Sequence, residues 1–341
     1  MKIYQTKEMC YGCGACAEIC PKDAIQMIQD REGFYYPRVD KNVCIECSKC
    51  KCVCPARDRE RKECNNLYYG AQAKEDKVRY SSSSGGVFSI LAQYIISQQG
   101  VVYGAGYDEN MNVLHQEVET NECLDMIKRS KYVQSDTSRI YSSIEDHLKE
   151  NIWVLFCGTP CQTQALRLYL NRNYVRLIVV DLVCYGVPSP GIWKAYVQYI
   201  EKKHNGKMTD FLFRDKRNSD NGHMRSYKID GREYVDSIYE DVYCNMYFRN
   251  YSLRPSCYKC KFCTVNRESD FTIGDFWGIE KVKPEVDDGM GTSLVIAHSE
   301  QARIIWEEVK NELRWFECEE RDVIQPRLVS TVDVVAGWRR V

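Results

Sequence analysis

Hydrophobic residues in the larger, C-terminal part of the chain recur with the periods of alternating strands and helices. Residues 86–98 carry apolar positions at helical spacing. Three short apolar segments have the composition of buried strands: 101–103, 152–156 and 175–184. Helical patterns at 162–171 and 191–203 follow the last two of them. Strands that alternate with helices predict a mixed or mostly parallel sheet with helices outside it.

Two hairpins and three further elements are expected from the same pattern. Residues 224–236, with Asp230-Gly231 at their centre, predict a hairpin. Another hairpin is expected over 25–40, where apolar segments flank a polar turn. Strands are predicted over 271–276 and 293–297, and a helix over 302–313.

The first 56 residues contain two copies of one cysteine pattern. The copies are Cys10-x-x-Cys13-x-x-Cys16-x-x-x-Cys20-Pro21 and Cys44-x-x-Cys47-x-x-Cys50-x-x-x-Cys54-Pro55. In this pattern three thiolates of each run hold one [4Fe–4S] cubane and the fourth crosses to the other cubane. We therefore assign the first cluster to Cys10, Cys13, Cys16 and Cys54, and the second to Cys44, Cys47, Cys50 and Cys20.

Zinc sites and disulfides are the alternatives for a chain with 19 cysteines. Pairs of the form Cys-x-x-Cys also bind zinc, but two complete runs that end in Cys-Pro favour clusters. The chain opens with polar residues instead of a secretory signal, so we expect a cytoplasmic, reducing setting without disulfides.

Length and charge define what else to expect. The 341 residues suffice for a small α+β ferredoxin-like domain over 1–56, a polar linker over 57–69 and a larger mixed α/β domain over 70–341. With 47 basic and 48 acidic residues, the chain gives no reason to expect nucleic acid as a partner. No apolar segment reaches the length of a membrane span, so no membrane insertion is expected.

A second set of cysteines is scattered through the larger domain near predicted turns. Cys161 and Cys184 follow two buried strands, whose ends should meet at one edge of the sheet. A Cys257-x-x-Cys260 pair would complete four ligands for a third cubane. On spacing alone, the alternative that some of these are small buried hydrophobic residues is equally good.

Several further motifs are spread over about residues 70–295 of the larger domain. They are Ser84-Gly85-Gly86, 130–135 (SKYVQS), 158–162 (GTPCQ), 181–186 (DLVCYG), Cys257-x-x-Cys260-Lys261 and 269–278 (SDFTIGDFWG). Together they resemble the coenzyme F420 hydrogenase/dehydrogenase beta-subunit family. The resemblance implies that one [4Fe–4S] cluster is bound by Cys161, Cys184, Cys257 and Cys260. Cys157 and Cys263 are additional here, so an exchange of ligands stays open.

The resemblance also implies FAD at the serine-rich stretch that precedes the helix at 86–98. Such a stretch suits a phosphate, although alone it is more often a flexible loop or a helix cap. We take the cofactor-binding residues to be Ser84, Gly85, Gly86, Lys131 and Thr159. FMN in place of FAD remains an alternative, as does an exposed surface role for Lys131. Asp275 and Trp277 would border the flavin or simply pack.

The function expected is that of an iron–sulfur flavoprotein oxidoreductase with three [4Fe–4S] clusters and FAD. Electrons would pass between the clusters and a flavin that exchanges hydride with a deazaflavin-like coenzyme or another organic substrate. The partners would be a redox protein, such as ferredoxin or another oxidoreductase subunit, and a small hydride donor or acceptor. We also allow for a homo-oligomer. The alternatives are a non-catalytic electron-transfer subunit of a larger complex and a metal-stabilised scaffold without flavin.

Overall fold

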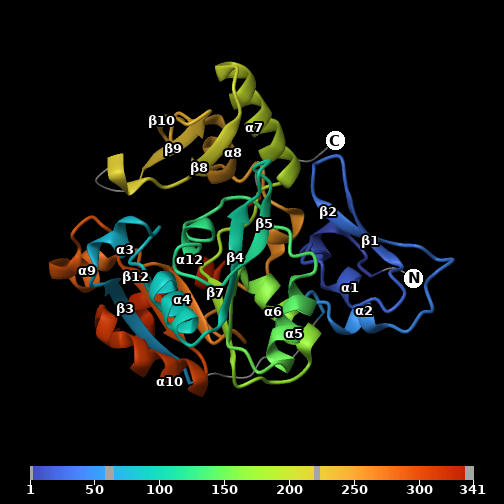
Figure 1. Ribbon diagram of the computed structural model, residues 1–341, viewed down its shortest axis with the longest axis horizontal. Helices are drawn as coiled ribbons and strands as arrows, with labels where there is room; N and C mark the ends of the chain where they lie inside the picture. Colours follow the sequence, from blue (N-terminus) through green and yellow to red (C-terminus); the bar gives the residue numbers. More distant parts are fainter. Residues whose placement is uncertain (1–2, 58–64, 219–222, 335–341) are drawn as a thin grey trace.

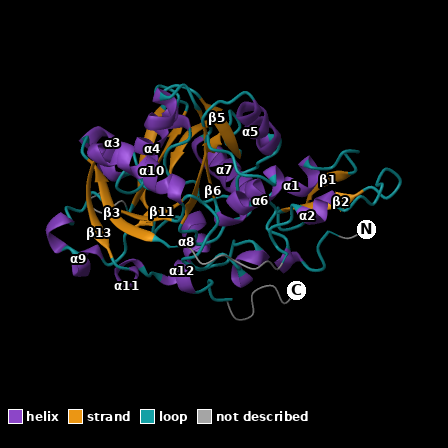
Figure 2. Ribbon diagram, turned by 90° about the horizontal axis from the view of Figure 1, so that it is seen from below, coloured by secondary structure: helices purple, strands orange, loops and turns teal. Residues whose placement is uncertain are grey.

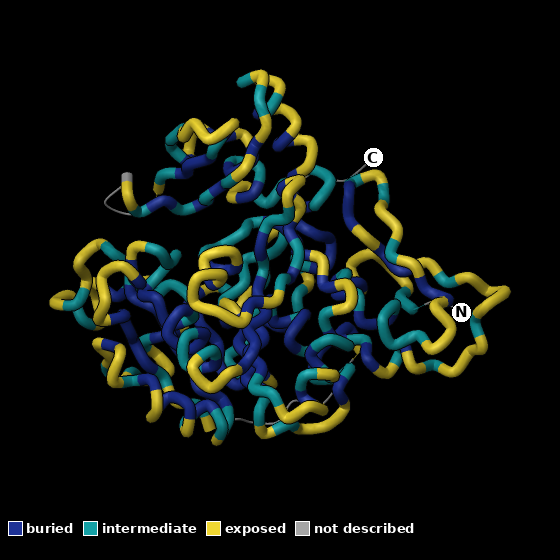
Figure 3. Tube along the Cα trace, in the orientation of Figure 1, coloured by how far each residue is buried: buried dark blue, intermediate teal, exposed yellow. Residues whose placement is uncertain are grey.

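The computed structural model describes residues 3–57, 65–218 and 223–334. An eight-stranded sheet with the order β13-β3-β12-β11-β7-β6-β4-β5 lies at the centre of the larger domain (Figure 1). Figure 3 shows the buried residues gathered along this sheet. Its strands are β3 (Leu67–Ala73), β4 (Val101–Tyr107), β5 (Val113–Val118), β6 (Val154–Gly158), β7 (Leu177–Leu182), β11 (Phe271–Asp275), β12 (Ser293–Ala297) and β13 (Leu313–Cys318).

Four neighbouring strands of the sheet run parallel, and the outer strands pair antiparallel. The parallel strands are β11, β7, β6 and β4. Antiparallel pairing adds β5 on one side and β12, β3 and β13 on the other. The four parallel strands end at one edge, which we call the carboxyl edge, and sheets of this kind bind ligands there.

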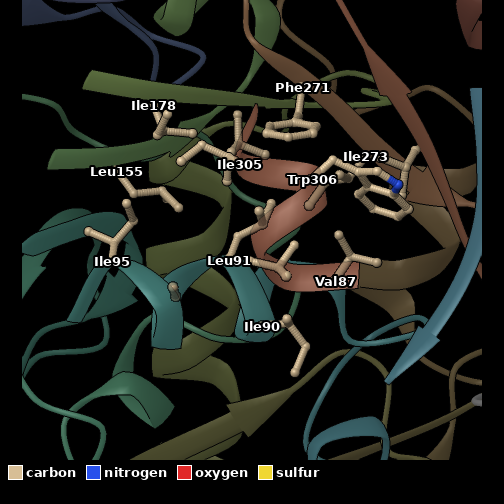
Figure 4. Close-up of a cluster of buried hydrophobic side chains, with 14 of the residues drawn as sticks. Val87, Ile90, Leu91, Ile95, Leu155, Ile178, Phe271, Ile273, Ile305 and Trp306 are labelled. Atoms are coloured by element: carbon tan, nitrogen blue, oxygen red, sulfur yellow. The ribbon is translucent and has the colours of Figure 1, made fainter. Parts of the chain in front are cut away.

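Helices cover both faces of the sheet because its strands are apolar on both sides. Leu155 of β6 faces α4 (Val87–Ser97) and α10 (Glu300–Val309), whereas its neighbours Val154 and Phe156 face α5 (Ile140–Lys149) and α6 (Pro160–Leu170). Figure 2 shows these helix layers, and Figure 4 shows the side chains packed between the sheet, α4 and α10. The remaining short helices are α3 (Asp76–Tyr80), α9 (Ile279–Val282), α11 (Glu320–Val323) and α12 (Pro326–Val329).

A smaller antiparallel sheet lies beside the carboxyl edge, at the top of Figure 1. Its core is aromatic, with Trp193, Phe211 and Phe213 in mutual contact. The turn between its last two strands has positive φ at Asp230 and Gly231, as a tight hairpin requires. Its elements are α7 (Pro190–His204), β8 (Met208–Leu212), β9 (Met224–Ile229), β10 (Arg232–Ser237) and α8 (Val242–Phe248).

The ferredoxin domain lies against α5 and α6, on the right of Figure 1. Ser142 donates hydrogen bonds from its amide and hydroxyl to Glu18, each at 2.7 Å. A Cβ added to Gly33 would lie 2.5 Å from the Cα of Gly191, so the backbones touch. The domain is therefore docked by direct contacts. Its elements are α1 (Ala15–Glu18), β1 (Ile25–Gln29), β2 (Tyr35–Val39) and α2 (Lys49–Cys52).

The structure differs from the sequence-based expectations at several boundaries. The predicted linker over 57–69 includes the start of β3, which begins at Leu67, and residues 58–64 lie outside the described residues. The helix predicted over 302–313 ends at Val309, and Leu313 begins β13. The antiparallel pairs β4–β5 and β3–β13 make the sheet mixed, which was one of the two expected arrangements. In the described parts of the chain, every helix is too short or too polar to cross a membrane.

Candidate functional site: three groups of cysteines and a polar groove

The two cysteine runs lie on matching short helices of the ferredoxin domain. Cys16 lies in α1 and Cys50 in α2. Each helix starts after a residue in the left-handed region, Gly14 with φ 75° and Ser48 with φ 62°. The second run thus repeats the backbone path of the first, as expected for two sites of one kind.

The thiols of the two runs gather in two groups. Burial raises the pKa of Cys16, and the thiolates of Cys10 and Cys54, followed by that of Cys50, raise it further. Burial also raises the pKa of Cys50, whose thiolate neighbours are Cys20, Cys47 and Cys44. Cys54 therefore lies with the first run and Cys20 with the second. The crossed assignment of Cys20 and Cys54 as cluster ligands stays a prediction.

The two groups differ in their exposure to solvent. Cys13 of the first group is buried, and the thiolate of Cys161 in the larger domain is among the charges that raise its pKa, after burial, Cys16 and Cys54. Cys47 of the second group is exposed, and beside it Ile45 has 57% of its surface exposed. The first group thus faces the larger domain and the second faces outward.

A third group of thiols lines a cavity at the carboxyl edge. Cys161 lies in the first turn of α6, where Thr159 and Gln162 form a capping box, and its Sγ lies 3.2 Å from Oγ1 of Thr159. The cavity is shared by five cysteines, which are Cys161, Cys184, Cys257, Cys260 and Cys263. A cubane has four thiolate ligands, so a cluster bound here would leave one of the five cysteines without iron.

The two additional cysteines of this region differ in position. Cys263 lies in the cavity, and a hydrogen bond with its thiol is the largest influence raising the pKa of Cys260. Cys157 does not line the cavity; it lies in β6, where Nε2 of His115 contacts its carbonyl oxygen at 3.0 Å. Burial raises the pKa of Cys157 to about 12. Of these two cysteines, only Cys263 is therefore placed to replace one of the four expected ligands of the third cluster.

Metal binding at these thiols would have to overcome their protonation. Burial raises the pKa of Cys184 and raises that of Cys257 to about 12. Metal ligation requires thiolates, so binding of a cluster would release the thiol protons, and the positive charge of the iron would stabilise the buried thiolates. Among the residues in the described ranges, no three His, Cys, Asp or Glu side chains are arranged to hold a single metal ion.

An apolar contact separates the first ferredoxin group from the third group. The rings of Tyr11 and Phe262 pack edge to face with centroids 5.3 Å apart. Cys54 of the first group and Cys161 and Cys260 of the third pack against these rings and Ala56. Tyr11 and Phe262 both line the five-thiol cavity. The packed side chains of Tyr11 and Phe262 therefore lie between the two groups of thiols.

A buried polar network supports the strand ends under the five-thiol cavity. Asp181 near the end of β7 accepts hydrogen bonds from Arg267 at 2.8 Å, Ser269 at 2.9 Å and Thr272 at 2.6 Å. Arg267 also donates to the carbonyl of Leu182 and lines the cavity. A buried carboxylate satisfied in this way fixes the positions of the surrounding strands.

The two glycines of the serine-rich stretch are required by protein packing. A Cβ at Gly85 would lie 2.2 Å from the carbonyl oxygen of Ala71 in β3. Gly86 has a φ of +94° and caps α4, and a Cβ there would lie 3.1 Å from that of Ala73. These contacts lie on the Cβ side of each glycine, and the binding of a cofactor by Gly85 and Gly86 stays a prediction. Ser84, which is half-buried, donates to the carbonyl of Thr292 at 2.9 Å.

Lys131 and the serine-rich stretch lie close together, whereas Thr159 lies beside Cys161. Ser130 donates from its amide to the hydroxyl of Ser83 at 2.8 Å. Lys131 is half-buried and donates to the carbonyl oxygen of Lys128, and burial lowers its pKa to about 7. The expected cofactor residues therefore divide between the stretch at 81–86 and the five-thiol cavity.

An open polar groove of about 410 Å³ adjoins the serine-rich stretch. Lys216 lines it and donates to the carbonyls of Ser84 at 2.6 Å and Met290 at 2.7 Å. Burial lowers the pKa of Lys216 to about 7, and the neighbouring Arg214 lowers it further. Trp277, with 54% of its surface exposed, lies on the same groove. Groove volumes of this order suit small organic ligands.

The groove residues Arg214 and Lys216 were not identified from the sequence. Arg214 forms an ion pair with Asp275 at the end of β11. Neither cation belongs to a sequence motif. Both follow β8 of the smaller sheet, and no sequence pattern predicted that this sheet lies beside the carboxyl edge. Only the fold brings them to the serine-rich stretch.

Comparison with known proteins gives two matches to families. Residues 152–321 match the family described as the C terminus of the beta subunit of coenzyme F420 hydrogenase/dehydrogenase. Residues 3–26 match the 4Fe-4S binding domain. The first match contains all five cysteines of the cavity, and the second contains the first cysteine run.

Individual relatives cover different parts of the chain. A subunit of the F(420)H(2) dehydrogenase of Methanosarcina mazei is 23% identical over 188 residues, which is 52% of this chain. The chain spans 53%, about half, of that relative. An uncharacterized ferredoxin of Methanocaldococcus jannaschii is 36% identical over 55 residues, which is 16% of this chain and 70% of the ferredoxin.

Among solved structures, similarity is found to a chain of the F420-reducing [NiFe] hydrogenase complex from Methanosarcina barkeri, studied by xenon derivatization. The TM-score is 0.47 with 16% sequence identity, over 75% of this chain and 82% of that chain.

Proposed function

This chain belongs to the coenzyme F420 hydrogenase/dehydrogenase beta-subunit family with a 4Fe-4S ferredoxin domain at its N-terminus, and on that premise we propose that it is an iron–sulfur flavoprotein oxidoreductase. Three [4Fe–4S] clusters would carry single electrons, and FAD would exchange hydride with a deazaflavin-like coenzyme or another organic substrate. The observation that carries the proposal is the five-thiol cavity adjoining the first ferredoxin group.

The residues of this chain support a path between the three groups of thiols. Tyr11 and Phe262 form an apolar, water-excluding contact between the first and third groups. The second group lies at the surface through Cys47, beside the exposed Ile45. We infer that a redox partner protein docks at this exposed end, because electron exchange needs a close approach to a cluster.

The polar groove is the part of the chain best suited to hold FAD near the serine-rich stretch. Lys216 and Arg214 provide positive charge for phosphate groups, and an anion there would favour the charged form of Lys216. The exposed ring of Trp277 offers a surface on which a flavin ring can stack. Gly85 and Gly86 would contribute by holding the stretch in place, and Ser84, Lys131 and Thr159 by polar contacts.

The experiment uses Trp277→Ala, because an exposed side chain can be removed with little effect on folding. We expect the affinity for flavin to fall about three- to tenfold, which is the value of one aromatic contact. Tyr199→Ala is the matched control, since Tyr199 is 56% exposed on α7 and does not line the groove. Chromatography of the cofactor released by heat distinguishes FAD from FMN.

Equal flavin affinity in both variants and the wild type would show that the flavin does not bind in this groove. The alternative function is a non-catalytic electron-transfer subunit of a larger redox complex; the Methanosarcina mazei relative is itself named as a subunit of a dehydrogenase. Turnover by the purified chain with a reductant and a candidate acceptor decides between the two. Flavin-loaded protein that passes electrons to an artificial acceptor, but turns over no organic substrate, would support the alternative.

A further inference from the structure

A fully buried arginine lies between the first and third groups of thiols. Arg254 precedes the 3₁₀ helix Pro255–Lys259, which carries Cys257, and its exposed fraction is 0%. Its Nε donates to the carbonyl of Cys10 at 2.7 Å, and Nη2 lies 3.6 Å from the Sγ of Cys10. Arg254 also lines the five-thiol cavity. One guanidinium thus contacts a ligand of the first group and borders the third.

The charge of Arg254 has no carboxylate partner among the described residues. Its other hydrogen bonds go to the side-chain oxygen of Gln134 at 2.9 Å and to the carbonyl of Tyr35 at 2.9 Å. The ring of Tyr36 lies 4.3 Å from the guanidinium carbon. A buried cation without an anion is costly unless an opposite charge lies near. The thiolates of Cys10 and of the five-thiol cavity are among the nearby groups that can supply negative charge.

The ferredoxin loop between Cys10 and Cys13 is shaped around this guanidinium. A Cβ added to Gly12 would lie 2.6 Å from the guanidinium carbon of Arg254 and 2.8 Å from Nε2 of Gln134. Gln134 in turn donates to the carbonyl of Tyr11 at 2.9 Å. The φ of Gly12 is +66°, a second reason for glycine. The arginine is therefore built into the junction of the two domains.

We propose that Arg254 is a positioning residue that serves as a shared countercharge and raises the reduction potentials of the first and third clusters. The inference rests on the proposed function, since it presumes those clusters. Transfer of one electron between the two cubanes would make the donor one charge less negative and the acceptor one charge more negative, without a proton transfer. A fixed cation with an N–H directed at a cysteine sulfur stabilises the more negative state. Because Arg254 adjoins both sites, it favours electron residence at either of them over the second cluster.

The test is an EPR-monitored redox titration of Arg254→Gln, Arg254→Lys and the wild type, with iron counted in each. In Arg254→Gln we expect the potentials of the first and third clusters to fall, so that the reduced-to-oxidised ratio at fixed potential drops about tenfold, or about 59 mV for one electron. Arg254→Lys keeps the charge and should shift less. The hydrogen bonds of Arg254 described above do not reach the ligands of the second cluster, which is therefore the internal control. Those ligands are Cys20, Cys44, Cys47 and Cys50.

Three unchanged potentials in a variant with full iron would overturn the inference, while the proposed function would stand. Absence of the third cluster from the wild type would instead contradict the proposed function. If Arg254→Gln fails to assemble its clusters, pulsed EPR of the wild type labelled with ¹⁵N-arginine decides. We expect a ¹⁵N coupling to the reduced first cluster in the labelled protein and none in the unlabelled protein. Absence of the coupling from the labelled protein would overturn the inference.

Discussion

One carbonyl at the junction of the ferredoxin domain with the larger domain accepts two buried hydrogen bonds. Thr137 Oγ1 and Tyr141 Oη each donate to the carbonyl oxygen of Cys13 at 2.8 Å. Thr137→Val or Tyr141→Phe leaves the carbonyl with one partner and should cost about 1 kcal/mol of docking free energy. The double variant leaves a buried acceptor without a partner. We expect it to cost more than the sum of the single variants, about 3 kcal/mol.

Amide hydrogen exchange measures this docking directly. The amide of Ser142 donates to Glu18 across the junction, and the amide of Gly191 donates to the carbonyl of Gly33. Protection of these amides should fall about fivefold in each single variant and more than about a hundredfold in the double variant, at about 1.4 kcal/mol per factor of ten. The amide of Val179, bonded to Asp270 inside the larger domain, is the control. Equal protection of Ser142 and Gly191 in the wild type and double variant would refute the reasoning.

Two further predictions concern the crossed ligands and a buried histidine. Cys20→Ala should remove the EPR signal of the second cluster, and Cys54→Ala should remove that of the first, because each thiol lies with the other run. If each variant instead lost the cluster of its own run, the crossed assignment would be wrong. His298 contacts Thr272 and Asn66, and burial lowers its pKa from 6.5 to about 3. Between pH values equal to these two pKa values, His298 is protonated in the unfolded chain and neutral in the folded chain. The contribution of neutral, buried His298 to stability is therefore fully present above about pH 6.5 and is lost as the pH falls. His298→Gln should remove about 1.4 kcal/mol per pH unit from the slope of unfolding free energy between about pH 4 and 6, and an unchanged slope would contradict the low pKa.

The sequence identified local features of the fold better than pairings between distant segments. The apolar segments at 152–156 and 175–184 became the buried strands β6 and β7 because every position in a central parallel strand faces a helix layer. The strand at Leu313 was missed because its pattern continues that of α10. Its strand conformation depends on pairing with the distant strand β3, in which Ala73 faces Leu313, and local sequence does not reveal this partner.

The candidate site divides in the same way. Fixed spacing predicted the ferredoxin groups, and the sheet-edge argument brought Cys161 and Cys184 together. Spacing did not distinguish Cys157 from Cys263, since one lies in a strand and the other in a loop that returns to the cavity. Nothing in the sequence around Arg254 indicates that it contacts Cys10, 244 residues away.

The most direct test of the central claim is the iron and acid-labile sulfide content of the anaerobically reconstituted chain. Three cubanes predict about twelve irons and about twelve sulfides per chain. A Cys184→Ala/Cys257→Ala variant should retain about eight of each, because it removes ligands of the third cluster alone. A content of about eight irons in the wild type, or zinc in place of iron at the five-thiol cavity, would contradict the account.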